Sequence, residues 1–229
     1  MSKNIALVED EALLRDNYAD SLKRNGYDVW EFSSRTDAYN SLSTRLPDLA
    51  IIDIGLEDEI DGGFSLCQDL RQISQTLPII FLSARDSDYD IVSGLRMGAD
   101  DYLTKDISLP NLLARISAIF RRISAHQNND NENDFVNNGN LVLDLKRYAV
   151  SWKNTSIDLT ITEFWLLYSM AKYPGHVKSR DQLMEDAKMV VDDSTITTHI
   201  KRIRRKFENI DSEFDNIETV YAAGYRWKS

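Results

Sequence analysis

The chain has 229 residues and 42% of them are hydrophobic, which is enough to build the core of one large or two modest domains. Its formal net charge of -10 argues against a simple binder of nucleic acid or anionic membrane, and its single cysteine, Cys67, excludes an internal disulfide framework and a cysteine-based zinc site. No stretch approaches the roughly eighteen apolar residues of a membrane span, so we expect a soluble, cytoplasmic protein with no membrane partner.

The chain is expected to divide near residues 124–134, which read SAHQNNDNEND and hold almost no apolar side chains. Such a composition buries too little apolar surface to offset the entropy of ordering and indicates a linker. We predict a first domain over residues 1–122, a linker over 123–134 and a second domain over 135–229. The first domain carries 13 basic and 21 acidic residues, and the second carries 14 and 13. This asymmetry predicts different partners for the two domains.

In the first domain, short apolar runs rich in β-formers alternate with amphipathic stretches. The predicted strands are 5–8, 29–32, 49–54, 79–82 and 102–104, and the predicted helices are 13–25, 35–45, 64–75, 88–97 and 109–122. Five such units predict the α/β class, with a doubly wound five-stranded parallel sheet covered by helices on both faces. Ligands of such sheets bind beyond the carboxyl ends of the strands.

Polar residues gather at these predicted strand ends. Glu9 and Asp10 follow the first strand, Asp53 lies at the end of the third, Ser83 follows the fourth, and Lys105 follows the fifth. Each alone is explained as a cap or turn residue, but five together are hard to ascribe to chance. Crowded carboxylates repel one another unless a hard cation such as Mg²⁺ lies among them. A carboxylate can also accept a phosphoryl group while a lysine neutralises the developing charge.

The combination of Glu9-Asp10, Asp53, Ser83-Ala84-Arg85 and the segment 98–105, GADDYLTK, resembles the receiver domain of bacterial two-component response regulators over residues 1–122. The resemblance implies that Asp53 accepts phosphate from a sensor histidine kinase and that Lys105 pairs with a phosphoryl oxygen. It also implies that Ser83 and the aromatic Tyr102 are the switch residues. The implied Mg²⁺ ligands are Glu9, Asp10, Asp53 and the carbonyl of Gly55.

Two departures from the receiver pattern lie close to this site. Asp106 follows Lys105, where the family usually has a proline in a cis peptide. The loop over residues 55–63, GLEDEIDGG, lacks the family's proline and carries added acids. If these acids face the site, they are expected to repel an incoming phosphodonor at low ionic strength.

In the second domain, the sequence predicts three helices. Thr160 and Glu163 form a capping box before an apolar helix that ends before Pro174-Gly175, and Ser179 can cap a short helix ending near Asp186. From residue 195 to 207, a helix is predicted to bury one apolar stripe, formed by Ile196, Ile200, Ile203 and Phe207. The opposite side carries Thr198, Lys201, Arg202 and Arg205, flanked by Thr197 and Arg204 and by His199 and Lys206. The pattern alone fits either a solvated basic face or a DNA recognition helix.

The motifs LT..EF at 159–164, SRDQL at 179–183, TITTHI at 195–200 and ETVYAAGYRW at 218–227 resemble the OmpR/PhoB-type winged-helix domain over residues 135–229. The resemblance implies a small N-terminal sheet over residues 141–152 and a recognition helix in the major groove of promoter DNA. It also implies a hairpin wing that places Tyr221 and Arg226 near the minor groove. It implies a phosphorylation-dependent transcriptional regulator that binds DNA as a homodimer, with RNA polymerase as a further partner. The charges implied for the receiver dimer interface are Arg96, Asp100, Asp101, Arg115 and Arg122.

The sequence admits two alternatives. A phosphatase of the haloacid dehalogenase type also uses a strand-end aspartate nucleophile, but it needs a second aspartate two residues on, where this chain has Gly55. An enzyme is therefore not expected. The other alternative is a DNA-binding regulator that works without phosphorylation, motivated by Asp106 and the altered 55–63 loop, and the sequence leaves it open.

Overall fold

The computed structural model describes residues 2–56, 59–127, 134–187 and 193–229, and it divides into two compact units, residues 1–113 and 114–229. The division falls inside helix α5 (Leu109–Gln127), which continues past the helix end predicted at residue 122. Residues 128–133 of the predicted linker lie outside the described residues.

Contacts of its second half explain why α5 reaches into the second unit. Arg122 Nη1 donates to Thr162 Oγ1 at 3.0 Å, and the Tyr148 hydroxyl donates to the carbonyl of Ile123 at 3.0 Å. The Ile123 side chain packs against the second unit's apolar core. The linker over 123–134 stays a prediction, but helical structure occupies its first residues.

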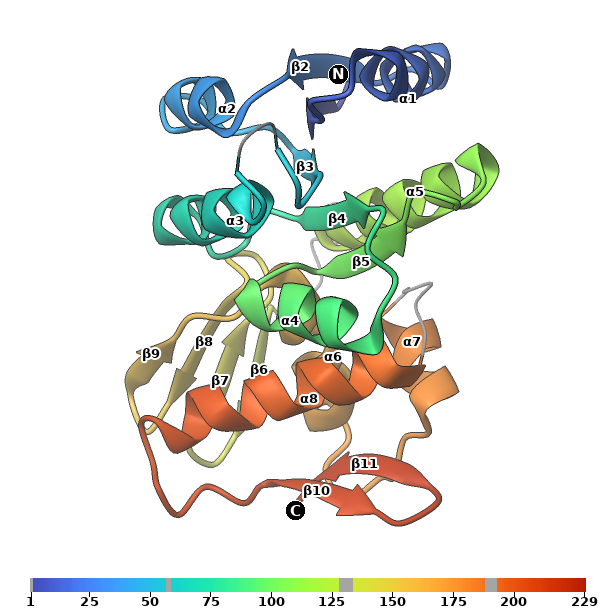
Figure 1. Ribbon diagram of the computed structural model, residues 1–229. Coiled ribbons are helices and arrows are strands. Elements are labelled where there is room, and N and C mark those ends of the chain that lie inside the picture. The colour runs from blue at the N-terminus through green and yellow to red at the C-terminus, as the bar shows by residue number, and fades with distance from the viewer. Residues whose placement is uncertain (1, 57–58, 128–133, 188–192) are drawn as a thin grey trace. The chain divides into compact units, whose positions relative to one another are not determined.

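The first unit is built on a parallel sheet of five strands in the order β2-β1-β3-β4-β5. The strands are β1 (Asn4–Val8), β2 (Asp28–Phe32), β3 (Leu49–Ile52), β4 (Ile79–Ser83) and β5 (Asp101–Thr104). The helices between them are α1 (Ala12–Arg24), α2 (Arg35–Leu42), α3 (Gly62–Ile73) and α4 (Asp88–Met97). Figure 1 shows α2, α3 and α4 on one face of the sheet and α1 on the other.

The predicted strands are therefore confirmed to within two residues at each end. Strands β1, β3 and β4 are almost entirely apolar and almost completely buried, because helices cover both faces of the sheet. Strand order reverses between β1 and β3, so the residues that follow these two strands lie at the topological switch point.

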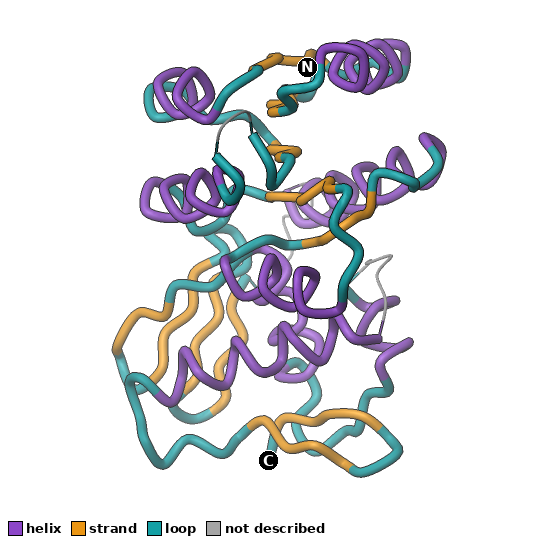
Figure 2. Tube along the Cα trace, in the orientation of Figure 1, coloured by secondary structure: helices purple, strands orange, loops and turns teal. Residues whose placement is uncertain are grey.

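After the end of α5, the second unit continues with an antiparallel sheet, further helices and a C-terminal hairpin (Figure 2). The sheet contains β6 (Phe135–Asn138), β7 (Leu141–Asp144), β8 (Ala149–Trp152) and β9 (Thr155–Ile157), so it is larger than the predicted 141–152. The helices are α6 (Ile161–Ala171), α7 (Arg180–Asp186) and α8 (Asp193–Glu208), and the hairpin pairs β10 (Ile217–Val220) with β11 (Gly224–Trp227). This is a winged helix-turn-helix fold, as expected.

The predicted local signals of the second unit are confirmed. Capping boxes begin α6, through Thr160 and Glu163, and α7, through Ser179 and Gln182. The apolar stripe of α8 is fully buried and ends at Phe207, which stacks on Phe214 and contacts the indoles of β8 and β11. No helix in the described parts of the chain is long and apolar enough to cross a bilayer.

Candidate functional site

The predicted strand-end acids come together in the first unit. Carboxylate oxygens of Glu9, Asp10 and Asp53 all lie within 4.8 Å of one another. Backbone pairing at the strand ends fixes this arrangement, because Asp53 N–H donates to the carbonyl of Val8 and Glu9 N–H to that of Phe32. Glu9 and Asp53 are 1% and 7% exposed, so their charges lie in a largely desolvated pocket.

Lys105 supplies the positive charge of this acidic pocket. Its Nζ lies 2.6 Å from Asp53 Oδ2 and 2.8 Å from Glu9 Oε1. Burial raises the pKa of the Glu9 carboxyl, and the nearby Asp53 adds to this rise although Lys105 opposes it. Burial alone would lower the pKa of Lys105, but its hydrogen bonds with Asp53 and Glu9 outweigh burial and raise it. The lysine therefore stays charged beside the carboxylates.

The absence of proline after Lys105 does not prevent this contact. No peptide bond among the described residues is cis, so the Lys105–Asp106 bond is trans. The Lys105 N–H donates to the carbonyl of Ser83 at 2.8 Å, and the Tyr18 hydroxyl approaches the carbonyl of Lys105 at 3.5 Å. These backbone contacts present the lysine to the pocket from the end of β5.

Gly63 is a residue of this site that sequence reasoning missed. Its N–H donates to the carbonyl of Ile54 at 2.9 Å, and a Cβ at this position would lie 2.0 Å from the carbonyl oxygen of Asp53. Only glycine allows α3 to begin this close to the end of β3. Gly55, whose carbonyl was predicted to bind Mg²⁺, has open space where a Cβ would stand. The adjacent glycines at 62–63 were the sequence signal that could have identified this close approach.

Ser83 and Tyr102 lie beside each other behind the pocket. Both are buried, at 2% and 8% exposure, and the Tyr102 hydroxyl donates to the carbonyl of Arg85 at 2.8 Å. Burial raises the pKa of Tyr102 to about 12, although its hydrogen bond with Ser83 acts in the opposite direction. Tyr102 is therefore turned inward and remains a neutral hydrogen-bond donor.

The two described acids of the 55–63 loop, Glu59 and Asp61, are both paired with arginine. Arg35 pairs with Glu59 at 3.2 Å, and Arg85 pairs with Asp61 at 3.0 Å. Glu57 and Asp58 lie outside the described residues. Arginines from α2 and from the β4–α4 loop therefore offset the charge of the two described acids, and the repulsion of a phosphodonor stays a prediction.

The charges predicted for a dimer interface differ widely in their surroundings. The prediction for Asp100 is wrong, because its fully buried carboxylate pairs with Arg71 at 2.9 Å and accepts the N–H of Ile79. Asp101 and Arg122 are also buried, at 4% exposure each, whereas Arg96 is exposed and Arg115 is half-buried. Arg122 is engaged with Thr162, so Arg96 and Arg115 are the accessible members of the predicted set.

The polar side of α8 is less open than its sequence predicted. Lys201 and Arg205 are exposed, as expected, but Thr198 is buried and its hydroxyl donates to the carbonyl of Ser194 at 3.0 Å. Arg202 pairs with the buried Glu163 carboxylate at 3.0 Å. The prediction of a solvent-facing side chain is therefore wrong for Thr198 and Arg202.

The flanks of α8 are attached to the hairpin. Arg204 donates to the carbonyl of Ile217 at 2.9 Å and to Thr219 Oγ1 at 2.8 Å. The Thr197 hydroxyl accepts a hydrogen bond from the Tyr225 hydroxyl at 3.3 Å, and Arg226 pairs with Glu218 across the hairpin at 2.7 Å. Arg204 and Thr197, two of the residues predicted to contact DNA, therefore hold the hairpin against α8, while Arg226 pairs within the hairpin.

The tip of the hairpin is different. Tyr221 is 96% exposed at the turn between β10 and β11. At the start of β11, directly after this turn, a Cβ on Gly224 would lie 2.0 Å from the carbonyl of Lys178, and Lys178 and Tyr225 exchange both backbone hydrogen bonds. The hairpin is therefore held in place up to the residues that adjoin its turn, while the Tyr221 side chain extends into solvent.

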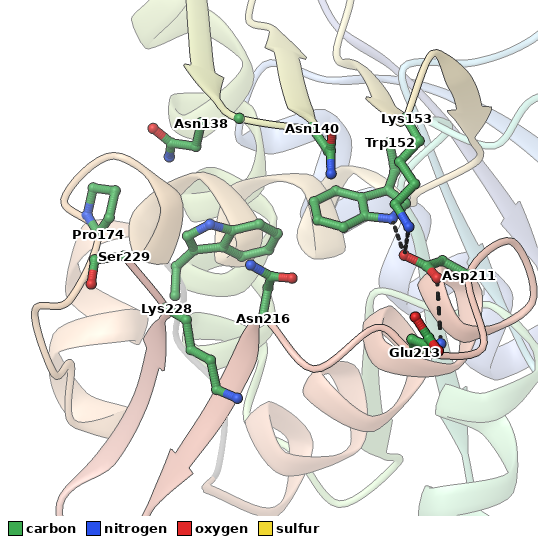
Figure 3. Close-up of a pocket in the computed structure, with 12 residues that line it drawn as sticks. Asn138, Asn140, Trp152, Lys153, Pro174, Asp211, Glu213, Asn216, Lys228 and Ser229 are labelled. Atoms are coloured by element: carbon green, nitrogen blue, oxygen red, sulfur yellow. Dashed lines mark hydrogen bonds and ion pairs between the residues drawn. The ribbon is translucent and has the colours of Figure 1, made fainter.

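A pocket of about 590 Å³ also lies in the second unit, between the β6–β7 turn, the end of β8 and the C-terminus (Figure 3). On one of its walls the Asp211 carboxylate accepts the indole N–H of Trp152 at 2.9 Å and pairs with Lys153 at 2.7 Å. The hydrogen bond with Lys153, followed by that with Trp152, lowers the pKa of Asp211. This wall ties the loop after α8 to the sheet.

Comparison with known proteins covers both units. Residues 5–117 match the family described as response regulator receiver domain, and residues 154–227 match the family described as transcriptional regulatory protein, C terminal. The transcriptional regulatory protein BaeR of Escherichia coli O6:H1 is 36% identical over 231 residues, which cover 98% of this chain and 92% of BaeR. The chain belongs to the OmpR/PhoB family of two-component response regulators. This OmpR/PhoB-family regulator joins a phospho-receiver domain to a DNA-binding domain.

Further relatives extend over the whole chain. The alkaline phosphatase synthesis transcriptional regulatory protein PhoP of Bacillus subtilis is 34% identical over 99% of this OmpR/PhoB-family chain and 97% of its own length. The structure of DrrB, an OmpR/PhoB homologue of Thermotoga maritima, superposes with a TM-score of 0.52 at 25% identity over the full length of both chains. A RitR mutant gives a TM-score of 0.77 over both full lengths at 24% identity, which shows a common fold.

Proposed function

We propose that Asp53 accepts a phosphoryl group from a sensor histidine kinase and that this event controls DNA binding by α8 and the hairpin. The contacts of Lys105 with Asp53 and Glu9, at 2.6 and 2.8 Å, carry the proposal. They place a charged amine against the carboxylate that would carry the phosphoryl group. Asp53 Oδ would attack phosphorus, the P–N bond of the donor phosphohistidine would break, and an acyl phosphate would form.

Three carboxylates within 4.8 Å of one another suit a hard divalent cation, so the residues fit Mg²⁺. Its ligands would be Glu9, Asp10, Asp53 and the Gly55 carbonyl, and the ion would offset negative charge on the transferred group. Lys105 would exchange part of its contact with Asp53 for a phosphoryl oxygen. The Ser83 hydroxyl would hydrogen-bond to another phosphoryl oxygen, with Tyr102 packed behind it.

The phosphorylated chain would form a homodimer through α4, β5 and α5, with Arg96 and Arg115 as its accessible charges. Two copies of α8 would then bind half-sites of double-stranded promoter DNA, where Lys201 and Arg205 contact the duplex and Tyr221 reaches the minor groove. RNA polymerase would be the partner at the promoter, and the cytoplasm would be the compartment.

The test is the intact mass of the protein after incubation with acetyl phosphate and Mg²⁺. We expect one phosphoryl adduct on the wild type, none on Asp53→Asn, and loss of the adduct when EDTA replaces Mg²⁺. A gel shift with duplex DNA then compares the phosphorylated and unmodified proteins. If Asp53→Asn binds DNA as tightly as the phosphorylated wild type, the phosphorylation-independent regulator replaces this proposal.

A further inference from the structure

Arg85 joins two loops that border the acidic pocket. It lies two residues after Ser83, between β4 and α4, and its Nη1 is 3.0 Å from Asp61 Oδ1 on the loop between β3 and α3. Its Nη2 donates to the carbonyl of Ile60, and its guanidinium carbon lies 6.0 Å from the centre of the Phe64 ring. One side chain therefore holds the segment after the acceptor strand against the segment after β4.

The backbone of the same residue contacts both predicted switch residues. The Arg85 N–H donates to Ser83 Oγ at 3.3 Å, and the Arg85 carbonyl accepts the Tyr102 hydroxyl at 2.8 Å. The inward position of the Tyr102 ring depends on Gly94 of α4, because a Cβ there would lie 2.7 Å from Tyr102 Cδ2. The Arg85 peptide thus hydrogen-bonds to the hydroxyls of both predicted switch residues.

We propose that Arg85 is a positioning residue for phosphoryl acceptance, whose side chain anchors the β4–α4 loop on Asp61 and Ile60 so that its backbone holds Ser83 and Tyr102 in place before the phosphoryl group arrives. The inference rests on the proposed function of Asp53. The Arg85–Asp61 pair by itself is partly exposed and therefore weak. The hydrogen bond to the Ile60 carbonyl and the Phe64 contact add to it.

If the Arg85 side chain instead covered the acidic pocket, its removal would have the opposite effect on the rate of phosphoryl uptake. The direction of the change in rate therefore separates these two roles. If Arg85 positions the switch residues, Arg85→Ala slows phosphoryl uptake. If Arg85 obstructs the entry of a donor, Arg85→Ala speeds uptake. The rate of adduct formation from acetyl phosphate, followed by intact mass, distinguishes these results.

We expect Arg85→Ala to slow uptake about fivefold, the size expected from losing a charged hydrogen bond and a partly exposed ion pair. Arg85→Lys should recover part of the rate, because lysine can pair with Asp61 but lacks the planar fork of donors. Arg24→Ala is the control, since Arg24 is an exposed arginine of the same unit that donates to Asp20 of its own helix. It should leave the rate unchanged.

A double-mutant cycle tests whether the effect runs through the switch residues. In a Tyr102→Phe background, which removes the hydroxyl that binds the Arg85 carbonyl, Arg85→Ala should slow uptake by less than twofold. An undiminished fivefold effect in that background, or unchanged or faster uptake in the single variant, would overturn the proposal.

Amide hydrogen exchange provides a measurement that needs no phosphoryl transfer. Exchange in peptides covering residues 83–87 should be about tenfold faster in Arg85→Ala than in the wild type or in Arg24→Ala, because the anchored loop opens more often. Equal exchange rates would overturn the inference. If the wild type forms no adduct at all, the proposed function of Asp53 fails, and the exchange rates still decide whether Arg85 anchors the loop.

Discussion

The Glu163 carboxylate, at the start of α6, lies 3.0 Å from Nε of Arg202 on α8. Lys206 contacts its other oxygen at 2.7 Å, and the N–H of Thr160 donates to that oxygen at 2.8 Å. The Glu163 side chain has no solvent exposure, so its charge is balanced entirely inside the second unit. Glu163, which caps α6, therefore also fixes the position of the basic helix α8.

Replacing Glu163 with glutamine should destabilise the second unit by about 3 kcal/mol, because removing one partner of a buried ion pair leaves the other uncompensated. The free energy of unfolding can be measured with urea and tryptophan fluorescence in a Trp30→Phe background. Three of the four tryptophans then remain, all in the second unit. Glu208→Gln, at an exposed position of α8, is the control and should change the free energy little. Equal stability of the two variants would contradict the anchoring role.

The stability of the second unit should also depend on pH. Burial acts to raise the pKa of Glu163, but Arg202 and Lys206 outweigh it, so the folded-state pKa lies below the ordinary value of 4.5. Its contribution to stability is then fully present above pH 4.5 and is lost as the pH falls through the folded-state pKa. We expect the urea midpoint of the wild type to fall below this pH more steeply than that of Glu163→Gln. Parallel pH curves would contradict the assignment.

The exposed basic residues of α8, Lys201 and Arg205, should contribute to DNA affinity and not to the free energy of unfolding. Lys201→Ala combined with Arg205→Ala should lower the slope of log affinity against log salt by about two, if each residue neutralises one phosphate. Fluorescence anisotropy with a mixed-sequence duplex measures this without knowledge of the promoter. Arg202→Ala provides the contrast, since it should lower the free energy of unfolding while the double variant does not. An unchanged salt slope in the double variant would exclude α8 as the DNA-binding helix.

The two glycines near Asp53 should respond differently to the same substitution. Gly63→Ala would place a Cβ 2.0 Å from the Asp53 carbonyl oxygen, whereas Gly55→Ala meets no atom within 4 Å. We expect Gly63→Ala to destabilise the first unit by about 2 kcal/mol, in the range of overpacking, and to abolish the phosphoryl adduct. Gly55→Ala should keep both properties near those of the wild type. Thermal unfolding and intact mass provide the two measurements.

The acidic pocket could be predicted from the sequence because parallel strands of a doubly wound sheet all end at one edge. Once the apolar runs had located the strands, Asp53 and Lys105 had to lie near each other despite the separation between them in the chain. The same periodicity located the buried stripe of α8, from Ile196 to Phe207. In both places the sequence signal is a local, repeated pattern, which locates the strands and the buried stripe. The fold then brings the strand ends together.

The sequence could not show which charges pair over long distances. Helical periodicity placed Arg202 on the polar side of α8, but its long side chain reaches the buried Glu163 on another helix. The family resemblance assigned Asp100 to the dimer surface, but its carboxylate is buried and its partner Arg71 lies on α3, far away in the sequence. The predicted end of α5, at residue 122, is too early. Arg122 and Ile123 contact the rest of the second unit, and such contacts leave no signal in helical periodicity.

The hairpin that follows α8 is attached to its surroundings through both of its strands. Arg204 of α8 donates to the carbonyl of Ile217 on β10, and Lys178 pairs with Tyr225 on β11, whereas the Tyr221 side chain at the turn is 96% exposed. The residue at position 221 can therefore change in evolution without disturbing the packing of the folded domain. Related chains could then differ in what the hairpin turn presents while the hairpin itself stays in the same place.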